Sequence, residues 1–223
     1  MINLNKSRDY FEPSKLGNTR CHIIGCGSVG GNIAVDLVRL GVTKLTLYDF
    51  DVVESHNLAN QIYRQKDVGD SKVEALLSIL TEINPELDCR IESEGWIGQQ
   101  LSGWVFLAPD SIDVRRQIVQ DNQYNTYIKA MFDFRTTLEG AQAFAADWGD
   151  PESIENFLNS MDFTHEEATE ATPVSACGTT LGVGSVPRMI ADIGVNNFLN
   201  FVRKGELKKL ILLNAFNFTI DAF

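Results

Sequence analysis

The sequence contains few basic residues for its acidic content. Its 223 residues include 19 Lys and Arg against 30 Asp and Glu, which gives a formal net charge of −11. Such a chain repels a phosphate backbone at long range, whereas nucleic-acid-binding proteins usually present a basic face. The composition therefore argues against nucleic-acid binding as the main activity. An acidic protein can still bind ATP, because backbone N–H groups and one or two cations hold the phosphates locally.

The sequence also lacks paired cysteines. It has four of them, and none forms a C-x-x-C pair: Cys21, Cys26, Cys89 and Cys177. Structural zinc sites are typically built from such pairs, so we expect no zinc. Isolated thiols are typical of a reducing compartment, and we expect reduced cysteines in a cytoplasmic protein.

Long apolar segments are absent as well. The N-terminal stretch MINLNKSRDYFEPSKLG has no apolar core of the kind that a secretory signal needs, and no apolar run reaches transmembrane length. The sequence shows no internal repeat and no low-complexity tract. We therefore expect a single domain over residues 1–223 and no membrane partner.

Helical and strand-like segments alternate along most of the chain. Apolar residues recur with helical spacing, as at Val29, Ile33 and Leu37. Such patterns predict helices at residues 29–40, 71–83, 111–122 and 185–203. Strand-like sequence lies at residues 20–25, 44–50, 88–93 and 104–108, at 126–134 and 139–147, which suggests a hairpin, and at 207–220. This order predicts an α/β fold, a Rossmann-like doubly wound sheet with a parallel N-terminal half and antiparallel C-terminal strands.

One acidic segment interrupts the alternation. Residues 149–172 are rich in Asp and Glu and have loop-like sequence. A charge run of this kind usually marks a solvated loop, although a long loop in a compact domain is often functional. We expect an irregular loop here.

Three glycines form a G-x-G-x-x-G turn between the first strand and the first helix. Gly25 permits a tight turn, Gly27 lets the backbone approach a phosphate or ribose, and Gly30 lets the helix pack against the sheet. The helix that follows points free N–H groups at an anion. Asp49 ends the second strand, where a carboxylate can bind ribose hydroxyls. These features alone fit ATP and NAD equally well, and a glycine turn without a ligand is the simplest alternative.

The sequence after the second strand is more specific. D-x-D stands at Asp49 and Asp51, NLANQ at 57–61 and VGDSKVE at 68–74. Further on, VFLAPDSIDVRRQI carries Asp110 and, five residues later, Arg115. In this order the motifs resemble those of the ThiF/MoeB family, the adenylating domain shared with ubiquitin-activating enzymes. The resemblance covers residues 20–120 well and residues 177–215 loosely.

The resemblance implies a reaction that joins the C-terminal carboxylate of a protein or peptide to AMP from ATP. Carboxylate and polyphosphate are both anions, so their repulsion must be offset before the α-phosphorus is attacked. By resemblance, Lys72 contacts the phosphates and stabilises charge in the transition state. Asp110 is implied to hold Mg²⁺, which neutralises the leaving pyrophosphate. The nucleotide-binding residues implied are Gly25, Gly27, Gly30, Asp49, Asp51, Asn57, Gln61, Arg64 and Lys72.

The two residues given chemical roles also have simpler explanations. A lysine that opens a helix is usually solvated, and this would apply to Lys72. Asp110 could cap the helix that begins near Ser111, which is a common role for aspartate. The ordered coincidence of the motifs favours the functional interpretation for both.

The chain departs from the family pattern at a cationic position. The arginine of the family's N-L-x-R-Q motif is Asn60 here, and loss of such a group typically raises a barrier by a few kcal/mol. Arg64 is the nearest substitute along the chain. The family's N-terminal arm often brings an arginine across a dimer interface, and Arg8 in KSRDYF is the weak counterpart here. Zinc-binding cysteine pairs, present in many members, are missing.

Cys177 follows the acidic segment, in ATPVSACGTTLG. In the family, a crossover loop near this point, here residues 149–176, carries a cysteine that accepts the acyl group as a thioester. A thiol near a helix N-terminus favours its thiolate form. The alternative is a small buried cysteine.

The leading hypothesis is thus an ATP-dependent adenylyltransferase that acts, as a homodimer, on a small ubiquitin-like or sulfur-carrier protein or a peptide with a free C-terminus. A first alternative is a degenerate, non-catalytic member that serves as a binding partner, which Asn60 motivates. A second alternative is a nicotinamide-dependent oxidoreductase, which would bind NAD and would need neither Lys72 nor Asp110.

Overall fold

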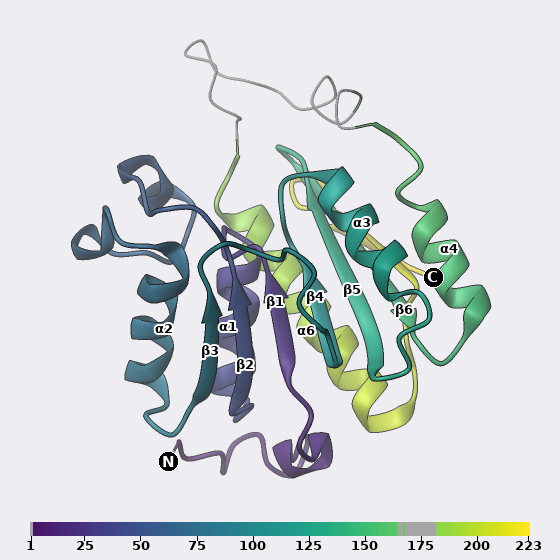
Figure 1. Ribbon diagram of the computed structural model, residues 1–223, viewed down its shortest axis with the longest axis horizontal. Coiled ribbons are helices and arrows are strands. Elements are labelled where there is room, and N and C mark those ends of the chain that lie inside the picture. Colours follow the sequence, from purple (N-terminus) through teal and green to yellow (C-terminus); the bar gives the residue numbers. More distant parts are fainter. Residues whose placement is uncertain (1, 165–166, 168–181) are drawn as a thin grey trace.

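A computed structural model describes residues 2–164, 167 and 182–223 (Figure 1). In this part of the chain one mixed sheet has eight strands in the order β3-β2-β1-β4-β5-β6-β7-β8. The strands are β1 (Cys21–Ile24), β2 (Lys44–Tyr48), β3 (Asp88–Glu92), β4 (Gly103–Leu107), β5 (Ile128–Thr136), β6 (Gly140–Asp147), β7 (Leu210–Asn214) and β8 (Thr219–Ala222). Strands β1 to β5 pair in parallel, and β6, β7 and β8 continue the sheet in antiparallel pairs. The predicted fold class is confirmed.

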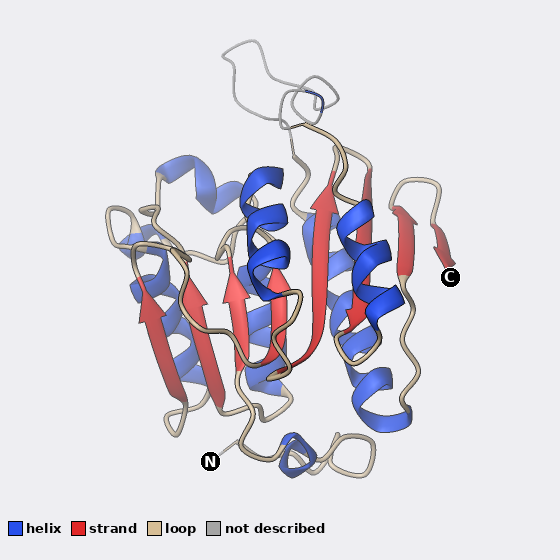
Figure 2. Cartoon of the chain, turned by 45° about the vertical axis from the view of Figure 1, so that its right-hand side comes forward, coloured by secondary structure: helices blue, strands red, loops and turns tan. Residues whose placement is uncertain are grey.

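Helices cover both faces of the sheet (Figures 1 and 2). They are α1 (Gly30–Arg39), α2 (Lys72–Ile83), α3 (Ile112–Asn122), α4 (Pro151–Asn159) and α6 (Ser185–Lys204), with short 3-10 turns at Pro13–Leu16, Ser55–Ala59 and Gln65–Asp67. Buried apolar residues of α1, α2 and α6 form one core, and those of α3 and α4 form a second. Two cores on opposite faces are what a doubly wound sheet requires. None of the helices in the described ranges is long and apolar enough to cross a membrane.

Most predicted elements appear where the periodicity placed them, including the hairpin of β5 and β6. The irregular loop predicted over residues 149–172 is wrong for its first part, because α4 occupies Pro151–Asn159. Asp150 caps this helix by accepting the N–H of Glu152, and Phe157 buries its ring against the sheet. The apolar residues of α4 have helical spacing, but the acidic residues between them obscured this pattern in the sequence. Of the proposed crossover loop, residues 165, 166 and 168–176 lie outside the described residues.

The strand order reverses next to β1. The chain runs outward from β1 to β2 and β3 and then returns to β4 on the other side of β1. Doubly wound sheets bind ligands at such a switch point, beyond the carboxyl ends of the strands. The segments that follow β1, β2 and β4 therefore meet at one edge of the sheet.

Helix α6 packs closely on the antiparallel part of the sheet through Gly194. A Cβ added at Gly194 would lie 2.1 Å from Cε1 of Phe134, which is itself fully buried in β5. We expect Gly194→Ala to lower the free energy of unfolding by about 1–3 kcal/mol through overpacking. This outcome would occur even though alanine is about 1 kcal/mol better than glycine in a helix interior.

Urea denaturation followed by circular dichroism measures this change. Asn196→Ala, at an exposed position two residues along the same helix, is the matched control and should leave stability within about 0.5 kcal/mol. An increase in stability for Gly194→Ala would contradict the tight packing.

Candidate functional site

The glycine turn fills the space beyond β1. A Cβ added at Gly25, which has φ +89°, would lie 2.5 Å from the carbonyl oxygen of Ala108, so this turn abuts the turn after β4. A Cβ at Gly30 would lie 1.9 Å from the carbonyl oxygen of Gly25. Nothing lies within 4 Å of a Cβ added at Gly27, so the backbone there faces open space. Two glycines are thus required by packing, and the third leaves room for a bound group.

Asp49 ties the glycine turn to the end of β2. Its Oδ2 accepts the N–H of Cys26 at 2.6 Å, and its Oδ1 accepts the N–H of Asp51 at 2.9 Å. Burial raises the pKa of this carboxyl, and the two backbone hydrogen bonds oppose the rise. Each oxygen retains a lone pair that a ribose hydroxyl could use, because a carboxylate has about four acceptor sites.

Lys72, the first residue of α2, is 7% exposed. It is therefore not the solvated lysine that a helix N-terminus usually carries. Its Nζ donates to Oδ2 of Asp51 at 2.7 Å. Burial has the largest single effect and acts to lower the pKa of Lys72, but the hydrogen bond to Asp51 and the charges of Asp49, Asp51 and Asp110 together outweigh it and raise the pKa. The amine is thus held as an ammonium.

The polar segment between β2 and α2 is closed by backbone hydrogen bonds. The N–H of Val53 donates to Asp70, and the N–H of Lys72 donates to Asp51, at 2.8 and 3.0 Å. The hydroxyl of Tyr63 lies 2.6 Å from the carbonyl oxygen of Cys26 and 3.3 Å from that of Lys72. Burial raises the pKa of Tyr63, so its hydroxyl stays protonated. This tyrosine, which the sequence analysis did not single out, links the glycine turn to the start of α2.

Asp110 is exposed and immediately follows the turn after β4. It does not cap α3, because Ser111 occupies the cap position and its side chain accepts the N–H of Val114. Its charge is among those that raise the pKa of Lys72. The structure thus brings together the two residues to which the motifs gave chemical roles.

No group of three or more His, Cys, Asp or Glu side chains that could hold a metal ion occurs within the described ranges. Mg²⁺ commonly binds through one or two carboxylates together with substrate phosphates, and a lone Asp110 fits that mode.

Arg115 fixes the turn that carries Asp110. Its guanidinium donates to the carbonyl oxygens of Leu107 and Pro109 and to the carboxylate of Asp133. Asp133 is fully buried and also accepts from Nε of Arg135 at 2.7 Å. The sequence analysis did not identify Asp133 and Arg135 as site residues. The one indication in the sequence was the presence of charged residues in the apolar strand YIKAMFDF.

The NLANQ segment lies beside the start of α6. Asn57 Oδ1 accepts the N–H of Glu54 at 2.9 Å, so this side chain orders the 3-10 turn. A Cβ added at Gly184 would lie 3.2 Å from Cα of Asn60, which places α6 against the position of the missing family arginine. Oε1 of Gln61 is the one buried side-chain oxygen without a hydrogen-bond partner among the described residues. Buried acceptors usually have a donor, so this atom fits a pocket completed by a bound group.

Arg64 does not reach the site. Its guanidinium donates to Asp67 at 2.9 Å and to Glu82 at 2.7 Å. Glu82 lies ten residues after Lys72 on α2, which is about 15 Å at 1.5 Å per residue. The ion pairs therefore hold Arg64 away from Lys72, and its assignment as a replacement cation is not supported. Arg8 lies in the N-terminal segment in an exposed ion pair with Glu12.

The cysteines offer no reactive thiol within the described ranges. Cys26 is fully buried in the glycine turn, and burial raises the pKa of its thiol, which agrees with a packing role. Cys21 and Cys89 lie in β1 and β3, where burial also raises their pKa values to about 12. Cys177 lies outside the described residues, so its predicted role stays a prediction.

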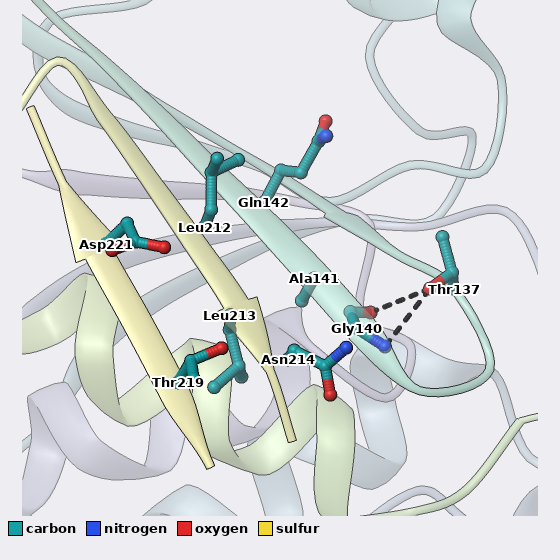
Figure 3. Close-up of a pocket in the computed structure, with 9 residues that line it drawn as sticks. All are labelled: Thr137, Gly140, Ala141, Gln142, Leu212, Leu213, Asn214, Thr219 and Asp221. Carbon is teal, nitrogen blue, oxygen red and sulfur yellow. Dashed lines mark hydrogen bonds between the residues drawn. The ribbon is translucent and has the colours of Figure 1, made fainter. Parts of the chain in front are cut away.

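A cavity of about 270 Å³ opens on β6, β7 and β8, between Thr137, Gln142 and Asp221 (Figure 3). It lies four strands from β1 in the sheet order, which is about 19 Å at 4.8 Å per strand. Asp221 is its one titratable lining residue. The cavity therefore has no part in the arrangement around Lys72.

The chain is similar to proteins of one family. The model of the ThiF family matches residues 9–219. Ubiquitin-like modifier-activating enzyme 5 of Drosophila persimilis is 43% identical over 95 residues, which are 43% of this chain and 23% of that protein. The enzyme of the same name from Arabidopsis thaliana is 42% identical over 65 residues, which are 29% of this chain and 15% of that protein. The matched segments span less than a quarter of these relatives.

Solved structures share the fold. E. coli MccB with ATP superposes with a TM-score of 0.72 at 20% identity, over 95% of this chain and 65% of that chain. PaaA superposes with a TM-score of 0.70 at 16% identity and the same coverage. The chain spans less than two thirds of these structures, and at such identity the likeness is one of fold.

We expect Arg115→Ala to lower the free energy of unfolding by about 1–3 kcal/mol, because it removes the donor to Asp133 and to two carbonyl oxygens while Arg135 still compensates the charge of Asp133. The substitution would remove one of the two guanidinium groups that contact Asp133. It would also remove a hydrogen-bond donor to the turn before Asp110. Urea denaturation measures the loss. Gln117→Ala, at an exposed position on the same helix, should change stability by less than about 0.5 kcal/mol. A loss no larger than that of this control would contradict the anchoring role.

Proposed function

The chain belongs to the ThiF family, and from that premise we propose that it is an ATP-dependent adenylyltransferase. Its substrate would be the C-terminal carboxylate of a small ubiquitin-like or sulfur-carrier protein or of a peptide. The observation that carries the proposal is the buried Lys72 ammonium at the switch point of the sheet, within electrostatic reach of Asp49, Asp51 and Asp110.

In the proposed reaction a carboxylate oxygen attacks the α-phosphorus of ATP. A bond forms between that oxygen and phosphorus, the bond to the pyrophosphate oxygen breaks, and the products are an acyl-adenylate and pyrophosphate. Both reactants are anions, so the site must offset their repulsion and the charge that develops on the leaving group. A preorganised ammonium in a water-poor site is effective at this, and Lys72 is the candidate. Mg²⁺ held by Asp110 and the phosphates would neutralise the pyrophosphate.

The residues around the glycine turn fit a nucleoside triphosphate. The open space at Gly27 would admit phosphate oxygens next to the first N–H groups of α1. Asp49 would accept from the ribose, and the unpartnered Oε1 of Gln61 would face a donor of the bound nucleotide. In-line positioning by these contacts would supply much of the rate enhancement, as in other phosphorus transfers.

Asp51 would position the ammonium. An ammonium has three donors, and the structure accounts for one of them in the 2.7 Å bond to Asp51. Lys72 can therefore keep this bond and still donate to a phosphate. We infer that Asp51 orients the amine and does not have to be displaced when ATP binds.

The relatives agree with this substrate class. The solved structures of E. coli MccB include one with ATP and one with both AMPCPP and MccA, and the curated relatives are activating enzymes for a ubiquitin-like modifier. We further propose a homodimer and a thioester at Cys177 as features of the family. The described residues support the adenylation step alone.

Asn60 favours a second candidate function, a binding partner that keeps the fold without catalysis. The position lacks the family cation, and Arg64 is held elsewhere by Asp67 and Glu82. Pyrophosphate exchange separates the two functions, because only an enzyme that forms an acyl-adenylate incorporates labelled pyrophosphate into ATP. Its absence across peptides with varied free C-termini, including ones that end in Gly-Gly, would favour the binding partner.

We expect Lys72→Ala to slow carrier-dependent pyrophosphate exchange by about 100-fold or more, the usual cost of removing one charge-stabilising donor. Lys66→Ala is the matched control, because Lys66 lies in the same polar segment with its side chain 64% exposed and 3.6 Å from Glu82. The control should exchange at the parent rate. Equal rates for both variants would remove Lys72 from the mechanism.

A thermal-shift experiment distinguishes ATP from NAD. A ligand present at about 100 times its Kd stabilises the folded state by about 2.7 kcal/mol. For a chain of this size that is a rise in Tm of about 5–10 °C. We expect the rise with ATP and Mg²⁺, its loss in Lys72→Ala, and no rise with NAD. Stabilisation by NAD alone would support the oxidoreductase.

A further inference from the structure

Arg188, in the first turns of α6, has no partner in the described part of the chain. It is exposed, and no hydrogen bond or ion pair joins it to another described residue. Asp192 follows it by four residues, but a cation that precedes a carboxylate is the less favourable order along a helix. The first turn of α6 contains no acidic residue. The described residues therefore leave the charge of Arg188 uncompensated.

This charge stands at the unfavourable end of the helix. The N-terminus of a helix carries a partial positive charge, so it repels a cation in the first turns and attracts an anion. α6 begins at Ser185, and Arg188 is its fourth residue. An anion that binds beside Arg188 would therefore be attracted both by the guanidinium and by the helix.

Helix α6 begins at the carboxyl edge of the sheet, where the nucleotide site is proposed (Figure 1). Gly184 precedes the helix with helical dihedral angles, and a Cβ added to it would lie 3.2 Å from Cα of Asn60. Side chains four residues apart lie on the same face of a helix. Arg188 therefore lies on the face of α6 that meets Asn60, one turn further along.

Helix geometry directs the side chain of Arg188 back toward Asn60. The Cα–Cβ bonds of a helix tilt toward its N-terminus, and long side chains cover the preceding turn. That turn begins at Gly184, about 6 Å away along the axis. An arginine can span one turn, since it forms ion pairs over this spacing. The guanidinium is thus directed to the side of Asn60, the position of the missing family arginine.

The residues after Asn60 lie against the start of α1. Cγ1 of Ile62 lies 3.3 Å from a Cβ added at Gly31, the second residue of α1. The hydroxyl of Tyr63 lies 2.6 Å from the carbonyl oxygen of Cys26 in the glycine turn. A guanidinium beside Asn60 is therefore close to the N–H groups of α1 that would hold phosphates.

The charges at this edge leave room for a second cation. Asp49, Asp51 and Asp110 act on a single ammonium, that of Lys72. Arg64 is held elsewhere by its ion pairs. A triphosphate would add further negative charge to an edge that is already acidic.

We propose that Arg188 supplies the cation that is missing at Asn60 and binds the triphosphate of ATP from α6. The inference rests on the proposed function, which makes ATP the ligand of the site. A guanidinium binds two phosphate oxygens through parallel N–H bonds, so the residue type fits this ligand. Lys72 then approaches the phosphates from the start of α2, and Arg188 approaches them from the start of α6.

Isothermal titration of the full chain with Mg–ATP tests the assignment. We expect Arg188→Ala to raise the Kd about 10-fold or more, which is the usual effect of losing a hydrogen bond to a charged group. Lys204→Ala is the matched control, because it also removes one positive charge from α6, at the opposite end and beside Glu206. The control should bind Mg–ATP with the Kd of the parent.

Two measurements distinguish phosphate binding from a structural role. The double variant Arg188→Ala/Asn60→Arg should recover most of the lost affinity, because the two positions face the same space. In the absence of ATP, Arg188→Ala should unfold at a urea concentration no lower than that of the parent, because the residue has no described partner to lose.

The outcomes separate this assignment from the proposed function. Equal Kd values for the parent and Arg188→Ala would overturn the role of Arg188 and leave the proposed function in place. A raised Kd that Asn60→Arg does not lower, or that accompanies a lower urea midpoint, would assign Arg188 a structural role and would overturn the inference as well. No binding of Mg–ATP by the parent and by Lys204→Ala would overturn the proposed function itself.

Discussion

One ion pair, between the buried Lys72 ammonium and the half-exposed Asp51 carboxylate, orders the carboxyl edge of the sheet. Nζ lies 2.7 Å from Oδ2, where the polar segment ends and α2 begins. A buried ammonium loses most of its hydration, so it needs a compensating charge close by. Asp51 supplies that charge, and the backbone bonds across the base of the segment keep the two residues together. Asn57 and Tyr63 are placed by the same closure.

The electrostatics of this edge restrict what it can bind. Carboxylates outnumber ammonium groups there, and the chain as a whole carries −11. A polyphosphate adds more negative charge, so it can be held only with a divalent cation and with the N–H groups at the start of α1. The acidity that argued against nucleic acid thus agrees with the proposal of a small anion that brings its own metal, which Asp110 would meet.

Sequence predicted the parts of this structure that depend on local pattern. The periodicity of strands and helices predicted the sheet. The spaced motifs predicted that Lys72 and Asp110 belong to one site at its edge. The sequence did not predict α4, because acidic residues obscured the pattern of its apolar face. It did not predict the partners of Arg64 either, because an arginine has several carboxylates within reach and only the folded chain selects among them. The Arg115, Asp133 and Arg135 network escaped for the same reason, since its members come from α3 and β5.

The contact between Gly25 and Ala108 packs the turns after β1 and β4 closely against each other. Backbone lies against backbone there, so we expect the glycine turn and the segment that carries Asp110 to move together. Among the described residues, the segment at 52–71 is therefore the wall of the candidate site that can move independently of these two turns. Residues 52–71 contain short 3-10 turns in place of long helices or strands, so we expect this segment to open at a lower free energy than the sheet.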